Sequence, residues 1–357
     1  MRTRMLCCAA AALLLFGVGM PAEAVKADTQ TQAVQEDAQR ELDLSKVKIT
    51  PASQTGYLQE GTSGPLLSAI PEYHFTLKST ELLSESDPDV DVWYESSNEA
   101  IEVKGSLVDN EITIRPDKVG KTVVTITVNE KEFRVKINTI AVKMPNSLLL
   151  ATKETKKYSV KGDADAKWSS SDPSVVRVAS DGTLYAKKTG NAVIRLRIGS
   201  YRLGCAVSVT TPERKKAVEK ASTIGHTCTY SQLKRMQEHY YDCSSLVWKA
   251  YHNYGVNFGS RYNAPVAADI GKWCVLNNKI VSGGFSEENV QKMRLQAGDL
   301  LFKTGAQNGR YKGIYHVEMI TGYTLYGFDE DGEPMIGIRW GTDDDKYYPI
   351  GQMVGRP

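Results

Sequence analysis

Short runs in which apolar and polar residues alternate fill the chain from about residue 47 to residue 211. The runs 122–128 and 133–137 are clear examples, and Gly and Asn residues stand between such runs. Alternation with a period of two is typical of half-buried strands. Several short strands separated by turn residues indicate β-sandwiches. We therefore predict that this segment is all-β.

Two patterns recur within this segment. Trp93 and the residues after it are echoed at Trp168, an offset of 75 (168 − 93), and the run 119–124 is echoed at 189–194, an offset of 70 (190 − 120). Two copies of one β-domain explain these echoes better than one large sheet. We place the copies at 47–139 and 140–211. We interpret both tryptophans as core residues rather than as platforms for carbohydrate.

The second copy carries the motifs Trp168-Ser-Ser-Ser-Asp-Pro, Asp181-Gly-Thr-Leu and Lys188-Thr-Gly. These motifs resemble the bacterial Ig-like domain of group 2. The resemblance covers 140–211 well and 47–139 less well, because 79–92 looks like an insertion. It implies two Ig-like sandwiches that act as surface spacers or adhesive modules.

The first 24 residues have the pattern of a secretory signal peptide. Arg2 and Arg4 precede an apolar run at 5–18, and Ala22-Glu23-Ala24 matches a cleavage site. The run is short for a retained membrane anchor. We expect a secreted or cell-wall-associated protein in which 25–46 forms a flexible polar leader. No later segment is apolar enough to predict a membrane span.

Composition narrows the function classes only slightly. The net charge of the 357 residues is +2, which gives no support to a nucleic-acid binder. Four cysteines follow the signal peptide, too few and too scattered for a disulfide scaffold. Cys228 with Cys274 is the pair to consider first, and the redox state of these two and of Cys205 stays open.

The remaining segment, 212–357, mixes helix and strand patterns, and the stretch 240–254 predicts a helix with a cysteine in its first turn. Asp242 is a favourable N-cap, because its carboxylate can accept from free backbone N–H groups. Apolar side chains follow at helical spacing, and Gly255 is the expected stop. Cys243 then lies at the positive end of the helix dipole, which favours a thiolate. A nucleophile and a small buried cysteine that only packs are both consistent with this pattern.

A cysteine nucleophile needs a base within hydrogen-bond reach. His252 lies nine residues along the same predicted helix, so it points away from Cys243. His239 is expected to be exposed, and His226 lies in a Gly-Thr-rich loop. His316 stands on a predicted strand at 313–322, after a Gly-Asp turn that leads into the strand of 300–302. A strand can hold a histidine rigidly toward a helix start.

This order of Asp242-Cys243-Ser-Ser-Leu-Val, Gly298-Asp299-Leu-Leu-Phe and His316-Val resembles the NlpC-type cell-wall endopeptidases over about 220–340. The resemblance implies an α+β papain-like cysteine peptidase domain, with Cys243 as nucleophile, His316 as base and Tyr230 near the oxyanion. It implies hydrolysis of an amide in the peptidoglycan stem peptide, next to a D-γ-glutamyl residue. Such catalysis proceeds through a thioester, so no metal or other cofactor is expected.

The chain departs from the family pattern at the third catalytic residue. The strand expected at 335–340 offers no acceptor, because Arg339 can only donate hydrogen bonds. Glu318, Asp343 or a backbone carbonyl could orient the imidazole instead. Asp299 is expected to fix its turn rather than to take part in chemistry, and the acidic run 329–333 is expected to be a solvated hairpin.

Two alternatives stay open. The first is an amidase of the same fold that cuts between muramic acid and L-alanine. The second is a non-catalytic surface protein that adheres through its Ig-like domains and binds the wall. The predicted fold class is thus a multidomain chain with two all-β sandwiches followed by an α+β domain.

Overall fold

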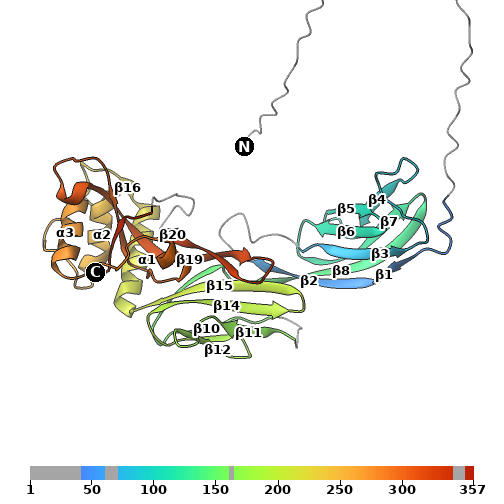
Figure 1. Ribbon diagram of the computed structural model, residues 1–357, viewed down its shortest axis with the longest axis horizontal. Coiled ribbons are helices and arrows are strands. Elements are labelled where there is room, and N and C mark those ends of the chain that lie inside the picture. The colour runs from blue at the N-terminus through green and yellow to red at the C-terminus, as the bar shows by residue number, and fades with distance from the viewer. Residues whose placement is uncertain (1–41, 61–70, 161–164, 341–349) are drawn as a thin grey trace, which may run out of the picture. The chain divides into compact units, whose positions relative to one another are not determined.

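The computed structural model describes residues 42–60, 71–160, 165–340 and 350–357. All elements named below belong to one compact unit, 43–357. The predicted signal peptide and nearly all of the predicted leader lie outside the described residues, as does Asp343. Strands predominate over helices (Figure 1). No helix in the described part of the chain is both long and apolar enough to cross a bilayer.

The first β-unit consists of two four-stranded sheets. Their strand orders are β1-β3-β6-β5 and β2-β8-β7-β4. Alternate side chains of β3, β6, β7 and β8 are buried, so each sheet turns one apolar face inward. The strands are β1 (Lys48–Thr50), β2 (Ser53–Glu60), β3 (Tyr73–Lys78), β4 (Val92–Ser96), β5 (Val103–Val108), β6 (Glu111–Pro116), β7 (Gly120–Val128) and β8 (Lys131–Lys143).

The second β-unit pairs a three-stranded sheet, β10-β13-β12, with a four-stranded sheet, β11-β14-β15-β9. Leu184 from the first sheet and Ile194 and Val207 from the second lie in one buried core. The strands are β9 (Ser147–Ala151), β10 (Thr155–Lys157), β11 (Lys167–Ser170), β12 (Val176–Val178), β13 (Thr183–Ala186), β14 (Gly190–Ile198) and β15 (Tyr201–Thr210). The predicted boundary between residues 139 and 140 falls inside β8, which continues to Lys143 because β2 pairs with it over that length.

The two β-units have equivalent strands, but the predicted match of Trp93 with Trp168 is wrong by one residue. Ser97 N–H donates to the Val123 carbonyl at 2.9 Å, and Ser171 N–H donates to the Val193 carbonyl at 2.9 Å, so these serines are equivalent. Counting back, Trp168 corresponds to Tyr94. Both rings lie over a glycine: a Cβ on Gly105 would collide with the Tyr94 ring, and one on Gly182 would collide with the Tyr158 carbonyl and come within 3.0 Å of the Trp168 ring.

Trp93 therefore has no core role. Its side chain is 71% exposed, which contradicts the prediction that both tryptophans are core residues. Trp168 is partly buried against the core of the second unit.

The C-terminal region combines helices with a four-stranded sheet of order β20-β19-β18-β21. Its helices are α1 (Pro212–Thr227), α2 (Cys243–His252), α3 (Ala267–Leu276), α4 (Glu287–Gln291) and the 3-10 turn η1 (Tyr311–Gly313). Its strands are the short pair β16 (Thr229–Tyr230) and β17 (Tyr240–Tyr241), with β18 (Leu300–Thr304), β19 (Ile314–Phe328), β20 (Pro334–Trp340) and β21 (Met353–Gly355). Side chains of α1, α2, α3, β18 and β19 share one core. The acidic run 329–333 forms the turn between β19 and β20.

The second β-unit and the C-terminal sheet also share apolar contacts. Val193 and Ala206 point away from their own sandwich core and lie in a buried cluster with Tyr323 and Leu325 of β19. Asn191 donates its amide to the carbonyls of Met293 and Leu295, both at 2.7 Å. The second β-unit is therefore part of the folded framework that supports the C-terminal sheet.

All four described cysteines are free thiols, so the pair Cys228 and Cys274 is not bonded here. Burial raises the pKa of the Cys205 thiol beyond the usual range and raises that of Cys274 to about 12. These two thiols are buried in apolar surroundings and are expected to be unreactive.

Candidate active site

Helix α2 begins where the sequence predicts, and its first residue is Cys243. The Asp242 carboxylate accepts from Ser245 N–H at 2.7 Å, and the Ser245 hydroxyl accepts from Asp242 N–H at 2.8 Å. This reciprocal pair is a capping box, which fixes the first turn of the helix. The Cys243 side chain is thereby held at the positive end of the helix.

Arg235, in the loop before α2, stabilises the start of this helix. Its guanidinium lies 3.1 Å from the Asp242 carboxylate. It also donates to the carbonyls of Ala264 and Pro265, the latter at 2.9 Å. Arg235 thus ties the loop before α2 and the loop before α3 to the residue next to Cys243.

Strand β19 carries His316, the predicted base, and a carboxylate beside it. His316 and Glu318 are two residues apart and lie on the same face of the strand, and His316 Nε2 is 2.9 Å from Glu318 Oε1. Lys303 stands opposite His316 in the register of β18 with β19, and its Nζ lies 3.4 Å from the same Glu318 oxygen. Because Glu318 occupies Nε2, Nδ1 is the ring nitrogen left for the thiol.

The Cys243 thiol and the His316 ring shift each other's pKa. Burial by itself would raise the pKa of Cys243. The hydrogen bond and charge of His316, together with the Val317 backbone N–H, outweigh it and lower that pKa below its usual range. Burial opposes the charge on His316, but contacts with Cys243 and Glu318 raise the pKa of the imidazole to about 9. The arrangement therefore favours a thiolate–imidazolium pair at neutral pH.

Tyr230 lies near Cys243, at the end of β16. The backbone N–H of Cys243 lowers the pKa of the Tyr230 phenol and so opposes part of the effect of burial. Burial and the negative charges of Cys243 and Asp242 raise the pKa of the Tyr230 phenol, so the hydroxyl keeps its proton at neutral pH. A proton-bearing hydroxyl next to a helix-start N–H can stabilise an oxyanion that forms on a bound carbonyl.

The structure thus brings together Cys243, His316, Tyr230 and Glu318, four of the residues that the sequence singled out. We call these four residues the Cys243 cluster. Asp343, the other candidate for the third position, lies outside the described residues. Sequence reasoning missed three contributors: Arg235, Lys303 and the backbone N–H of Val317. Lys303 could have been found, because two predicted antiparallel strands place it across from His316. The other two depend on loop and backbone geometry that no local pattern encodes.

The remaining histidines of this region have other surroundings. His226 lies in the last turn of α1 and not in the predicted loop, and its Nδ1 is 2.7 Å from the Ser222 carbonyl. His252 stacks on Trp248 with ring centroids 4.2 Å apart. His239 is exposed. Within the described residues, no three or more His, Cys, Asp or Glu side chains are grouped so as to hold a metal ion.

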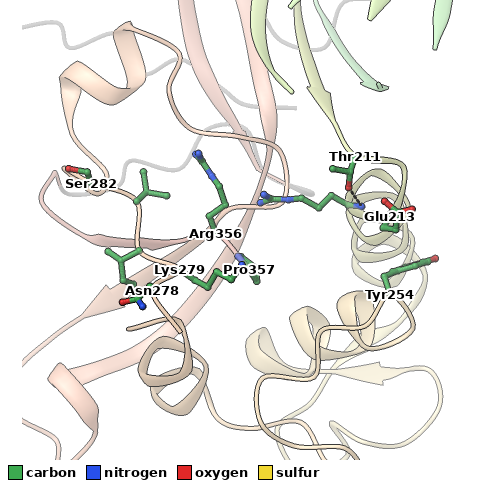
Figure 2. A pocket seen from close by; sticks show the side chains of 11 residues that line it. Thr211, Glu213, Tyr254, Asn278, Lys279, Ser282, Arg356 and Pro357 are labelled. Carbon is green, nitrogen blue, oxygen red and sulfur yellow. Dashed lines mark hydrogen bonds between the residues drawn. The ribbon is translucent and has the colours of Figure 1, made fainter. Parts of the chain in front are cut away.

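A pocket of about 650 Å³ lies elsewhere in the C-terminal region (Figure 2). Thr211, Arg214, Tyr254, Lys279 and Arg356 are among the residues that line it. None of the lining residues belongs to the Cys243 cluster, so this pocket is not the predicted catalytic cleft.

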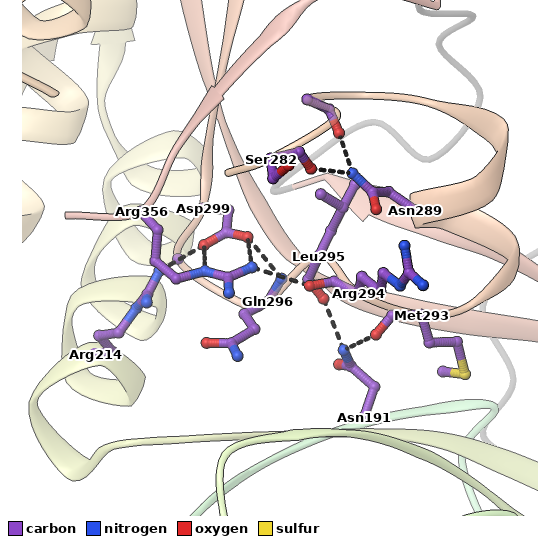
Figure 3. A network of polar contacts seen from close by, with 12 residues as sticks. Asn191, Arg214, Ser282, Asn289, Met293, Arg294, Leu295, Gln296, Asp299 and Arg356 are labelled. Atoms are coloured by element: carbon purple, nitrogen blue, oxygen red, sulfur yellow. Dashed lines mark hydrogen bonds and ion pairs between the residues drawn. The ribbon is translucent and has the colours of Figure 1, made fainter. Parts of the chain in front are cut away.

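Asp299 is fully buried in a network of arginines (Figure 3). Its carboxylate lies 2.9 Å from Arg214 and 2.7 Å from Arg356, and it accepts from Gln296 N–H at 2.8 Å. The contact with Gln296 closes the turn before β18. Asp299 therefore holds the turn and joins α1 to the chain near β21, a structural role.

No protein-family model and no curated protein matches the chain. Among solved structures, invasin, titled a bacterial integrin-binding protein, is 12% identical over 47% of this chain and 39% of its own, with a TM-score of 0.28. Domains 4 and 5 of the S-layer protein SbsC are 18% identical over 38% of this chain and 83% of theirs, with a TM-score of 0.17. A GH10 xylanase from termite gut that contains a bacterial Ig-like domain is 18% identical over 24% of each chain, with a TM-score of 0.18.

This chain therefore matches only part of these structures, 39% of the length of invasin. At such identities and TM-scores these likenesses do not indicate a function for this chain.

Proposed function

We propose that the protein is a secreted cysteine endopeptidase of the NlpC type that hydrolyses an amide bond in the stem peptide of peptidoglycan. The observation that carries the proposal is the cluster at the start of α2. Cys243 has a lowered pKa, His316 is coupled to it, and Glu318 lies 2.9 Å from the imidazole. A buried cysteine that only packs needs none of these partners. Cys274 is such a cysteine, and its pKa is raised to about 12.

The proposed reaction begins with attack of the Cys243 thiolate on the scissile carbonyl carbon. The oxygen of the resulting tetrahedral intermediate lies near Cys243 N–H and the Tyr230 hydroxyl, which stabilise its charge. The imidazolium of His316 then donates its Nδ1 proton to the leaving amine, the C–N bond breaks and a thioester remains. His316 next takes a proton from the water that attacks the thioester carbonyl carbon. The C–S bond then breaks, the acid leaves, and the Cys243 thiolate and the His316 imidazolium are restored.

Glu318 is a positioning residue in this scheme. By accepting from Nε2 it fixes the tautomer and orientation of the ring, and its charge stabilises the imidazolium. It takes the place of the polar group that the family supplies from the following strand. Lys303 in turn holds the Glu318 carboxylate.

The two β-units favour a second candidate function, that of a surface protein that binds the cell wall without hydrolysing it. They account for a large share of the described chain and contribute no residue to the Cys243 cluster. An amidase of the same fold remains the nearest catalytic alternative, since the cluster itself does not select the scissile bond.

The test is digestion of purified peptidoglycan by the full-length chain, with mass spectrometry of the soluble fragments. The account expects new stem-peptide fragments whose ends identify the bond as an endopeptidase or an amidase product. Cys243→Ala and His316→Ala should abolish release, whereas Cys228→Ala, a free thiol outside the cluster, should keep it. Undiminished release by either active-site variant would refute the mechanism, and no release from any wall type would favour the binding protein.

A further inference from the structure

The exposed indole of Trp93 lies on an outward sheet face of the first β-unit. β4, which carries Trp93, is an edge strand of the β2-β8-β7-β4 sheet. Trp93 pairs with Thr127 and Thr127 pairs with Glu132, and the next rung on this face is Glu95, Thr125 and Arg134. The side chains that flank the indole are therefore hydroxyls and charged groups on a regular, open surface.

The same face continues to a hollow. In the rung after Thr125, Val123 pairs with Lys136, and in the rung after that Lys121 pairs with Asn138. These residues, with Ser53 and Thr55 of β2, line a hollow of about 300 Å³. Thr127 and Val123 are four residues apart on β7, so the hollow begins about 13 Å from the level of Trp93 at the usual rise per strand residue.

The charges on this face differ between its two ends. Near Trp93, Arg134 is paired with Glu132 at 3.0 Å. At the hollow, Lys121 and Lys136 have no ion pair with any carboxylate in the described part of the chain. The hollow therefore presents positive charge with amide and hydroxyl groups. The other end presents an aromatic ring beside the Glu95 carboxylate and the paired Arg134 and Glu132.

The second β-unit shows how the equivalent face is used. Val193, the equivalent of Val123, lies in the apolar cluster shared with β19. Asn191, the equivalent of Lys121, donates to the carbonyls of Met293 and Leu295. The face is thus a contact surface in the second copy. In the first copy it has the same geometry but carries Thr125, Arg134 and Lys136, which suit a polar ligand better than an apolar protein face.

We infer that this face of the first β-unit binds an acidic polysaccharide strand. One sugar stacks its C–H face on the indole of Trp93, and neighbouring hydroxyls bond to Thr125 and Thr127. A carboxylate further along the strand pairs with Lys121 and Lys136 at the hollow. The inference does not depend on the proposed peptidase, because this face contains no residue of the Cys243 cluster.

The test is affinity electrophoresis of the full-length chain, in a Cys243→Ser background so that no substrate is cut. The gels contain soluble glycan strands of peptidoglycan, hyaluronan or neutral dextran. We expect retardation by at least one of the two acidic glycans and none by dextran, and which acidic glycan acts identifies the source. Trp93→Ala should weaken retardation at least about tenfold, since an aromatic stacking contact and its buried area are lost. Lys136→Gln should weaken it and reduce its dependence on salt.

Leu82→Ala is the matched control, because Leu82 is a similarly exposed apolar side chain, 69% accessible, beside the β5–β6 turn of the other sheet. It should leave retardation unchanged. Equal retardation of the Trp93→Ala variant, equal retardation by dextran, or no retardation by either acidic glycan would overturn the inference. Self-association that Trp93→Ala abolishes, without glycan binding, would overturn it too and assign the face to a second copy of the chain.

Discussion

Replacing Glu318 by Gln tests the electrostatics of the Cys243 cluster most sharply. Gln keeps the shape and one acceptor oxygen but removes the charge that faces His316 Nε2 at 2.9 Å. A hydrogen bond to a charged group contributes about 1.5–3 kcal/mol. The His316 and Glu318 side chains are only 27% and 15% exposed, so solvent screens little of that contribution. Since one pKa unit corresponds to about 1.4 kcal/mol, the imidazole pKa should fall by about one to two units.

The direction of the change in reactivity follows from the raised pKa of His316 and the lowered pKa of Cys243. In the wild type His316 has a pKa of about 9, so the imidazolium is kept below that pH and lost above it. Without the Glu318 charge the imidazolium is lost at lower pH, and Cys243 receives less stabilisation of its thiolate. Fewer thiolate–imidazolium pairs are then present at neutral pH.

The assay is the rate of Cys243 alkylation by iodoacetamide as a function of pH, with the modified residue identified by mass spectrometry. The wild type should show two rises, the first when Cys243 ionises beside the imidazolium and the second near pH 9, when His316 loses its proton. In Glu318→Gln the second rise should move down by about one to two pH units. Lys303→Met is the control of opposite sign, because it removes a cation 3.4 Å from the Glu318 carboxylate and should move the second rise upward. An unchanged profile in Glu318→Gln would refute the role of Glu318.

Three further predictions concern Tyr230, Asp299 and Asn191. Tyr230→Phe removes the hydroxyl at the Cys243 N–H, so peptidoglycan hydrolysis should fall by about 100-fold while the alkylation rate changes little; an unchanged hydrolysis rate would exclude an oxyanion role. Asp299→Ala leaves two arginines with no buried carboxylate, and urea unfolding should show a loss of about 3–5 kcal/mol, whereas a loss below 1 kcal/mol would contradict the buried network. Asn191→Ala leaves two carbonyls without their donor, so the same assay should show a loss of about 1–3 kcal/mol, and no loss would mean that the second β-unit does not support the C-terminal sheet.

The start of α2 could be predicted because the evidence for it is local. Asp242, Cys243 and the apolar stripe lie within one short stretch, and an N-cap acts on residues two or three positions away. The placing of His316 on a strand is also local, since alternation defines it. The identity of its partner is not. Glu318 and Asp343 were equal candidates in the sequence, and only the strand geometry puts the Glu318 oxygen 2.9 Å from the ring.

The repeat shows why sequence similarity can mislead over single residues. Matching Trp93 with Trp168 aligned identical residues, but the strand pairing makes Tyr94 the equivalent of Trp168, because Tyr94 pairs with Ile126 and Trp168 pairs with Leu196. The contact between β14 and the C-terminal sheet was missed for a different reason. Val193 and Ile194 are neighbours on one strand and both are fully buried, which is typical of a strand covered on both faces. In the sequence, the adjacent apolar residues Val193 and Ile194 could have indicated that β14 is covered on its second face as well.

Trapping of an acyl-enzyme tests the central claim most directly. The full-length chain is mixed with a purified stem-peptide substrate, quenched in acid and analysed by intact-mass and peptide mass spectrometry. The account predicts a thioester adduct on Cys243 equal to the acyl half of the substrate, absent from Cys243→Ser and accumulating when deacylation is slowed. Release of both product halves by Cys243→Ser at the wild-type rate, with no adduct on any cysteine, would contradict it.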